Sequence, residues 1–389
     1  MKPIRLGLCT LMLSLQVAAN DKLITYLPTW KDASLVNPAG AQLGKVDYAI
    51  LSFIEVTPSG EAVLSKSTQN GAALWKPHLA NARKANPQFN CMWAIGGWSL
   101  SANIAKTAQT DAGRSKLAKS ALNIMRDSGC IGLDLDWEHP VTGGDFAADA
   151  SAADFQNWVS LLREMRKTLD EAGKADNKKY LLTAAIPANN GGWVMQGYNL
   201  KGALPLLDWV NLMAYDRSGG WSKTATLQAS LHSVPNDPDG NVLSSSKAVE
   251  YLIAQGAKPA QLVLGVPFYV RGLGNVAAGP NGDGLVQSMN GPGLKDEAEA
   301  GVASWADFQR KYAKADVWKA YRNAESGQSP YLYHAAKKEL ITFDDPISLA
   351  EKVKFVKTKK LGGVMIWEIT QDDAQFTLLN SLKKTLNAK

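Results

Sequence analysis

Hydrophobic residues along the chain fall into short runs that alternate with amphipathic stretches. Eight such runs begin at residues 23, 46, 91, 130, 180, 208, 262 and 362. The clearest helical spacing of apolar positions covers 72–85, 114–127, 152–172, 246–255 and 346–359. Short apolar runs between helical patterns are typical of strands that are buried on both faces. The chain is therefore expected to alternate strands and helices around a parallel sheet.

Eight strands in about 370 residues match the size of a (β/α)8 TIM barrel with an insertion. A doubly wound open sheet is the structural alternative, because it uses the same alternation of elements. No glycine-rich phosphate turn follows the first apolar run, which counts against the dinucleotide-binding form of that alternative. We predict an α/β fold of the barrel type.

One connection is too long to be an ordinary loop. It lies between the seventh apolar run and the last helical pattern and covers about 75 residues. Its segment "YLYHAAKKELITF" has the alternation and the turn residues of a β-hairpin. We therefore predict a small α+β insertion at 271–345, with the barrel formed by 20–270 and 346–389.

The first nineteen residues have the pattern of an export signal. Lys2 and Arg5 precede an apolar run, and small residues at 17–19 suit cleavage by a signal peptidase. A retained membrane anchor is the alternative, but the run is shorter than the ~18 apolar residues that span a bilayer. We predict a signal peptide at 1–19 and a secreted or periplasmic protein that has no membrane association after cleavage.

Charge and cysteine content exclude some classes of protein. The formal net charge is +6, and removal of Lys2 and Arg5 leaves +4, without a run of five like charges. This pattern does not support nucleic-acid binding. After loss of the signal, Cys91 and Cys130 remain, which is too few for a disulfide scaffold. Because they begin neighbouring parallel strands, where a bridge is geometrically awkward, we predict two buried thiols.

The candidate chemistry lies in the fourth apolar run. Asp134, Asp136 and Glu138 occupy every second position, so their side chains share one face of a strand. A barrel strand has no face toward water, so these acids are expected inside the barrel, near its top. Buried carboxylates are costly unless they share protons, form hydrogen bonds or take part in a reaction. A purely structural acid cluster is the alternative.

The segment "LDLDWEHP" resembles the D-x-x-D-x-D-x-E signature of glycoside hydrolase family 18, the chitinases and their relatives. Further motifs resemble the family's other strands in the same order along the chain. They are "TYLPTW" at 25–30, "AIGGW" at 94–98, "LMAYD" at 212–216, "LGVPFYVR" at 264–271 and "GGVMIWE" at 362–368. The resemblance covers almost the whole chain after the signal, and it implies the same barrel fold.

The resemblance also implies a mechanism in which the N-acetyl group of the substrate is the nucleophile, without a metal or a cofactor. Glu138 is then the proton donor to the glycosidic oxygen. Asp136 orients the acetamido group and holds the positive charge of the oxazolinium ion, and Asp134 shares a proton with Asp136. Tyr215 donates a hydrogen bond to the acetamido oxygen, and Asp216 positions that group or the attacking water.

Aromatic side chains are expected to bind the sugar rings, because indoles stack on their C–H faces. The resemblance places Trp367 beneath the cleaved sugar and gives Met213, Tyr269 and Arg271 to the substrate-binding surface. Other aromatic candidates lie at strand ends, where ordinary packing is an equal alternative: Trp30, Phe53, Trp98 and Trp221. Trp137 points to the opposite face from the acids and is predicted to belong to the core.

Three positions depart from the family pattern. Ile131 replaces the first Asp of the signature, and Ala94 replaces the Ser of S-x-G-G. In the family both missing groups help to hold the inner acid, so Asp134 is expected to have fewer partners. His139 stands where the family usually has Tyr, and it is expected to be neutral without a catalytic role.

These observations predict an exported, monomeric chitinase that cleaves β-1,4 bonds next to N-acetylglucosamine with retention, and that can also transfer the sugar. Its expected partners are chitin or chito-oligosaccharides. The alternatives are an endo-N-acetylglucosaminidase that acts on glycoproteins or peptidoglycan, and a chitin-binding lectin without activity. The lectin is less expected because Glu138, the proposed acid, is present.

Overall fold

The computed structural model describes residues 21–188, 192–240, 244–314 and 316–388. The predicted signal peptide at 1–19 lies outside these residues. Within them, no helix combines the length and the apolar composition that crossing a membrane requires.

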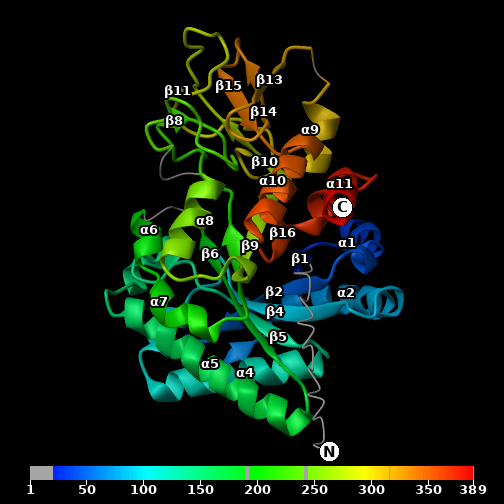
Figure 1. Cartoon of the computed structure of the whole chain (residues 1–389), viewed down its shortest axis with the longest axis vertical. Coiled ribbons are helices and arrows are strands. Elements are labelled where there is room, and N and C mark those ends of the chain that lie inside the picture. Colours follow the sequence, from blue (N-terminus) through cyan, green and yellow to red (C-terminus); the bar gives the residue numbers. More distant parts are fainter. Residues whose placement is uncertain (1–20, 189–191, 241–243, 315, 389) are drawn as a thin grey trace, which may run out of the picture.

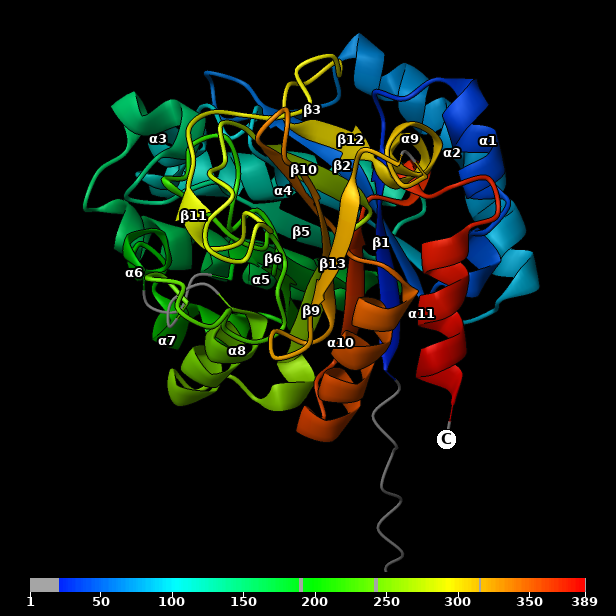
Figure 2. The same ribbon diagram turned by 90° about the horizontal axis from the view of Figure 1, so that it is seen from above.

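Eight of the described strands pair in parallel and close into a barrel (Figures 1 and 2). They are β1 (Lys22–Pro28), β2 (Tyr48–Val56), β4 (Asn90–Gly96), β5 (Gly132–Asp136), β6 (Leu181–Pro187), β7 (Trp209–Met213), β9 (Leu262–Pro267) and β16 (Gly363–Trp367). β1 pairs with β16 on one side and with β2 on the other, which closes the ring. The predicted (β/α)8 barrel is confirmed, and each strand overlaps one of the eight apolar runs.

Helices surround the barrel in the view from above (Figure 2). The five expected helical stretches correspond to α2 (Lys66–Ala85), α4 (Asp111–Asp127), α5 (Asp154–Asp176), α8 (Ser245–Ala254) and α10 (Pro346–Lys359). The others in the barrel are α1 (Ala33–Gly40), α3 (Ile104–Ala108), α6 (Trp193–Gln196), α7 (Leu200–Ala203) and α11 (Thr377–Asn387). Several of these helices begin after a residue whose side chain accepts a hydrogen bond from the first turn. For example, Asp345 accepts hydrogen bonds from the backbone of Ile347 and Ser348 at the start of α10.

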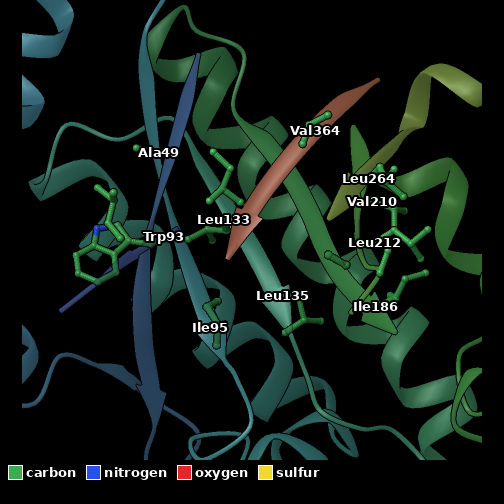
Figure 3. Close-up of a cluster of buried hydrophobic side chains, with 14 of the residues drawn as sticks. Ala49, Trp93, Ile95, Leu133, Leu135, Ile186, Val210, Leu212, Leu264 and Val364 are labelled. Atoms are coloured by element: carbon green, nitrogen blue, oxygen red, sulfur yellow. The ribbon is translucent and has the colours of Figure 1, made fainter. Parts of the chain in front are cut away.

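Alternate residues of each barrel strand enter two different hydrophobic layers. Leu133 and Leu135 of β5 point outward and pack with the layer between strands and helices, as Figure 3 shows. The interior layer includes Ile24, Met92 and Met365 from other strands. Full burial of one such side chain contributes roughly 1.5–3 kcal/mol. This alternation directs Asp134, which lies between the two leucines, and Asp136, which follows them, into the barrel.

A second sheet lies beyond the carboxyl end of β9, at one end of the barrel (Figure 1). Its strands within the described residues, in spatial order, are β12 (Val302–Ser304), β10 (Tyr269–Leu273), β15 (Glu339–Thr342), β14 (Ser329–His334) and β13 (Lys319–Asn323). The expected hairpin is confirmed, because β14 and β15 pair antiparallel. Smaller elements are β3 (Ala62–Val63), β8 (Thr224–Ala225), β11 (Gln287–Ser288) and α9 (Trp305–Lys311).

The prediction of two free thiols is wrong, because Cys91 and Cys130 form a disulfide. Cys91 lies in β4, and Cys130 lies just before β5, the neighbouring strand. Their Cα atoms are 4.7 Å apart, which is within the range that a disulfide spans. Cys130 precedes the regular part of its strand. The strand geometry that makes a bridge between directly paired parallel residues awkward therefore does not apply to it.

Candidate active site

The three acids of β5 and its carboxyl end differ in their exposure. Asp134 and Asp136 are buried on the inner face of the barrel, with 0% and 3% of their surface exposed. Glu138 lies two residues beyond the strand, and its side chain is 14% exposed. The expected row of acids inside the barrel and near its top is therefore present in the structure. Chemistry in barrel enzymes takes place at this end of the strands.

Asp134 is held by donors from three other strands. Its carboxylate accepts hydrogen bonds from Tyr26 of β1 (Oη to Oδ2, 2.6 Å), from the Thr183 hydroxyl of β6 and from Asn211 of β7 (Nδ2 to Oδ1, 3.0 Å). Burial raises the pKa of Asp134, and these three bonds oppose that rise. Asp134 therefore has three hydrogen-bond donors from other strands, while Ile131 and Ala94 supply none.

The Asn211 amide is itself oriented. The indole Nε1 of Trp209 donates to Asn211 Oδ1 at 3.0 Å, so the amide nitrogen turns toward Asp134. Tyr26, Thr183 and Asn211 were not predicted from the sequence as functional residues. Each is a polar side chain within an apolar run, and only Thr183 lies on a strand that pairs with β5. Thr183 is in register with Asp134.

Asp136 has a different environment from Asp134. Its Oδ1 atom is buried and has no hydrogen-bond partner among the described residues. Burial, together with the charges of Glu138 and Asp134, raises the pKa of Asp136 well above its usual range. An oxygen of this kind is available to a group that enters with the substrate.

Glu138 is kept protonated by its surroundings. Burial and the negative charges of Asp216 and Asp145 raise its pKa to about 8. Its backbone N–H donates to Ser101 Oγ at 2.9 Å, and the Ser101 hydroxyl donates to the Gly97 carbonyl at 2.9 Å. Ser101 was not predicted as a site residue, and nothing in the sequence around it indicates this contact. A carboxylic acid at the mouth of a barrel is a suitable proton donor near neutral pH.

The glycines after β4 allow the strand ends to approach closely. Gly96 has φ +100°, and a Cβ atom at this position would lie 2.3 Å from the backbone oxygen of Asp136. The next amide, that of Gly97, donates to the same oxygen at 2.7 Å. Glycine is required here because a side chain would push away the segment that carries the acids.

The motif after β7 connects to the second sheet. Asp216 Oδ1 accepts hydrogen bonds from Tyr269 Oη at 2.6 Å and from Arg271 Nε at 2.7 Å, both of β10. The Arg271 guanidinium also lies 4.8 Å from the centre of the Trp221 ring. Tyr215 is buried, and its hydroxyl is 3.8 Å from the sulfur of Met365, a weak acceptor. The Tyr215 hydroxyl can therefore donate to a stronger acceptor.

Aromatic side chains surround the acids with different exposures. Trp367 contacts Phe53 and Trp30, with ring centroids 5.9 Å and 6.4 Å away. Phe53 is buried, whereas the exposed aromatic candidates are about half open to solvent: Trp30 at 51%, Trp98 at 50% and Trp221 at 60%. Met213 packs partly buried against the inner layer. Trp137 is 3% exposed in the outer layer, which confirms it as a core residue.

A closed (β/α)8 barrel with a protonated acid at the mouth and exposed indoles around it defines a barrel enzyme suited to acid-catalysed cleavage of sugar chains. The model of glycosyl hydrolases family 18 matches residues 22–372. The chain belongs to this family and is a glycoside hydrolase.

Known relatives carry chitinase names. Chitinase A1 of Niallia circulans is 35% identical over 313 residues, which are 79% of this chain but only 44% of the relative. Endochitinase 1 of Metarhizium robertsii is also 35% identical, over 86% of this chain and 77% of the relative. Among solved structures, a family 18 N-acetylglucosaminidase of Paenibacillus barengoltzii has a TM-score of 0.80 at 26% identity, covering 94% of this chain and all of the relative.

Proposed function

We propose that the protein is an exported chitinase that hydrolyses β-1,4-linked N-acetylglucosamine chains with retention, through attack by the substrate's own acetamido group. One observation carries this proposal. Glu138, an acid held in its protonated form, stands two residues from Asp136, whose buried Oδ1 atom has no partner among the described residues. The first group can protonate a leaving oxygen, and the second can accept the N–H of an acetamido group.

In the first step the acetamido oxygen bonds to the anomeric carbon while the glycosidic bond breaks. Glu138 gives its proton to the departing oxygen. Asp136 accepts the acetamido N–H. As positive charge develops on the oxazolinium ion, the proton of Asp136 passes to Asp134, and the Asp136 anion then stabilises that charge. Tyr215, whose hydroxyl has only a sulfur near it, donates to the acetamido carbonyl and aligns it for attack.

In the second step water attacks the same carbon, and the bond to the acetamido oxygen breaks. The Glu138 carboxylate formed in the first step takes a proton from this water, which returns the enzyme to its starting state. Two displacements at one carbon give net retention. A second sugar in place of water would give transfer instead of hydrolysis, so both outcomes belong to the same proposal.

The surroundings of the other carboxyl groups favour this route over a covalent enzyme intermediate. An attacking carboxylate must be ionised before positive charge has formed on the sugar, and at that stage burial and the charges of Glu138 and Asp134 disfavour the anion at Asp136. The Oδ1 atom of Asp216 is engaged by Tyr269 and Arg271. Neither side chain is arranged as a free nucleophile.

The exposed aromatic residues support a polymeric sugar as the substrate. Trp30, Trp98 and Trp221 expose their indoles around the acids, and each can stack on a sugar ring. The chitinase names of the curated relatives agree with N-acetylglucosamine chains.

Digestion of chito-oligosaccharides, followed by NMR of the first products, tests the function. The proposal expects the new reducing ends to appear as the β anomer, and an initial α anomer would contradict it. Release of single sugars from a chain end would instead indicate an exo-acting N-acetylglucosaminidase. Cleavage of glycoprotein or peptidoglycan substrates alone would select the endo-N-acetylglucosaminidase, and binding without cleavage would indicate a lectin.

The variant Glu138→Gln tests the proton donor. It should bind oligosaccharide normally but lower kcat by about 10²- to 10⁴-fold, because an amide cannot protonate the leaving oxygen. Glu297→Gln is a matched control, since the Glu297 side chain is only 7% exposed and pairs with Lys311 outside the site. Near-normal turnover by Glu138→Gln would exclude Glu138 as the acid.

A further inference from the structure

His139, the residue after the proposed acid, makes contacts that the family mechanism does not use. Its ring is buried, with 9% of the residue exposed. Nδ1 lies 2.7 Å from the Tyr198 hydroxyl, and Nε2 lies 3.7 Å from Glu138 Oε2. The edges of Trp98 and Tyr198 pack against the ring, with centroids 6.1 Å away. One nitrogen therefore faces a fixed hydroxyl, and the other faces the acid.

The hydrogen bonds of Tyr198 determine which nitrogen of His139 carries the proton. The Tyr198 hydroxyl donates its only hydrogen to the backbone carbonyl of Trp137 at 2.9 Å, because a carbonyl can only accept. Its oxygen can then only accept from the ring, so the hydrogen of His139 is on Nδ1. Burial lowers the pKa of His139 to about 4, so the ring is neutral above that pH. Nε2 therefore carries a lone pair.

This tautomer acts on the state of Glu138. The lone pair of His139 Nε2, 3.7 Å from Glu138 Oε2, disfavours the ionised form of Glu138. The same lone pair can accept the proton of the Glu138 carboxylic acid if the Glu138 side chain rotates slightly. The other tautomer would present an N–H and would stabilise the ionised form. The charged groups that act on Glu138 from neighbouring segments are Asp136, Asp145 and Asp216, and all are carboxylates. Their negative charges disfavour ionised Glu138, and the tyrosines Tyr198 and Tyr215 are further titratable groups that its charge reaches. The Tyr198 hydrogen is committed to the Trp137 carbonyl, so the His139 tautomer decides whether an N–H faces Glu138 from this side.

We propose that His139, held in one tautomer by Tyr198, is a positioning residue that keeps Glu138 in its acid form. The ring takes up no proton during the reaction, because the Glu138 proton goes to the leaving oxygen and returns from water. This inference rests on the proposed role of Glu138 as the proton donor.

The variant Tyr198→Phe tests the inference through the pH profile of kcat/KM. Loss of the hydroxyl frees Nδ1, so the ring can carry its hydrogen on Nε2 and donate to Glu138. The alkaline limb should move to lower pH by about half a unit to one unit, because a hydrogen bond to the charged form lowers a pKa. The phenyl ring keeps the edge contact with Trp158, whose centroid is 5.0 Å away. Tyr333→Phe, which loses a buried bond from a tyrosine to the Val276 carbonyl, is the matched control.

A double-variant cycle separates this effect from packing. In a His139→Phe background no ring nitrogen remains, so adding Tyr198→Phe should leave the alkaline limb unchanged. An equal shift in both backgrounds, or no shift in Tyr198→Phe alone, overturns the inference. Proton-detected nitrogen NMR of the wild-type histidines, assigned through His139→Phe, gives a reading that does not depend on how the tyrosine variant folds. A proton on Nε2 of His139 would also overturn it. If Glu138→Gln keeps its activity, the proposed function fails instead.

Discussion

The three acids of β5 and its end are chemically alike, but their neighbours give them different states. Asp134 has donors from Tyr26, Thr183 and Asn211, so its charge is stabilised despite full burial. Asp136 has an oxygen without a partner among the described groups. Glu138 has carboxylates nearby and its pKa is raised to about 8. An inner anion, an acceptor for the substrate and an outer acid can therefore lie on alternate positions of one segment.

The raised pKa of Glu138 predicts a dependence of stability on pH. The folded state binds its proton up to about pH 8, whereas the ordinary value is 4.5. Between these values the folded state holds more protons, so the free energy of unfolding falls as pH rises through this window. Urea unfolding at several pH values should show a weaker fall in Glu138→Gln. Equal slopes for the variant and the wild type would contradict the assigned state.

A second prediction at this scale concerns Asp136 and the oxazolinium ion. A thiazoline mimic of this cyclic intermediate should inhibit competitively. Asp136→Asn should weaken the mimic more than it weakens intact substrate, because the carboxylate meets a full positive charge only in the intermediate. Inhibition constants with and without Asp136→Asn measure binding of the mimic. Binding of intact substrate is measured in the inactive Glu138→Gln form, also with and without Asp136→Asn. A covalent sugar adduct on Asp136 or Asp216, trapped with a fluorinated sugar, would falsify the substrate-assisted route.

At the scale of elements, β4 and β5 are joined by pairing, by the contacts of Gly96 and Gly97 at their carboxyl ends, and by a disulfide at their amino ends. The disulfide therefore lies at the opposite end of the strands from Glu138. Its role is to link two neighbouring strands, and it is separate from the chemistry of the site.

Replacement of Cys91 and Cys130 by Ala tests this separation. The bridge closes a loop with a sequence separation of 39 residues. By the chain-entropy model its loss should reduce the free energy of unfolding by about 4 kcal/mol. Turnover at moderate temperature should stay near the wild-type value. Denaturant unfolding and chitinase assays measure the two quantities, and a large loss of kcat in a folded variant would show that the bridge also shapes the site.

Strand alternation explains how much of this could be predicted from the sequence. Eight apolar runs are enough to predict the barrel, and the period of two places Asp134, Asp136 and Glu138 on its inner face. The donors to Asp134 come from strands distant in sequence, and contacts between them depend on barrel register, which no local pattern contains. The disulfide between Cys91 and Cys130 was missed for a similar reason, since irregular backbone before β5 sets the separation of these residues.

At the scale of the whole molecule, the second sheet supplies part of the site. β10 begins two residues after β9 ends, and it carries Tyr269 and Arg271 to Asp216 in the segment after β7. Arg271 also stacks on the exposed indole of Trp221. The sheet therefore holds in place a carboxylate whose charge raises the pKa of Glu138.

This arrangement predicts opposite pH shifts from the two members of one ion pair. Asp216→Asn removes a negative charge that disfavours ionised Glu138, so the pKa of Glu138 should fall. Arg271→Met leaves the Asp216 charge without its cation, so that pKa should rise. The alkaline limb of kcat/KM should move down by about half a unit in the first variant and up by a similar amount in the second.

Arg310→Met is the matched control, because Arg310 pairs with Asp307 on α9 and has no contact with the site acids. Its pH profile should equal that of the wild type. The two shifts should also shrink at high salt, since Asp216 is 40% exposed and its field is partly screened. If both variants moved the limb in the same direction, the effect would come from displacement of the segment after β7 rather than from charge. The second sheet would then act on Glu138 through the shape of the site and not through its electrostatic field.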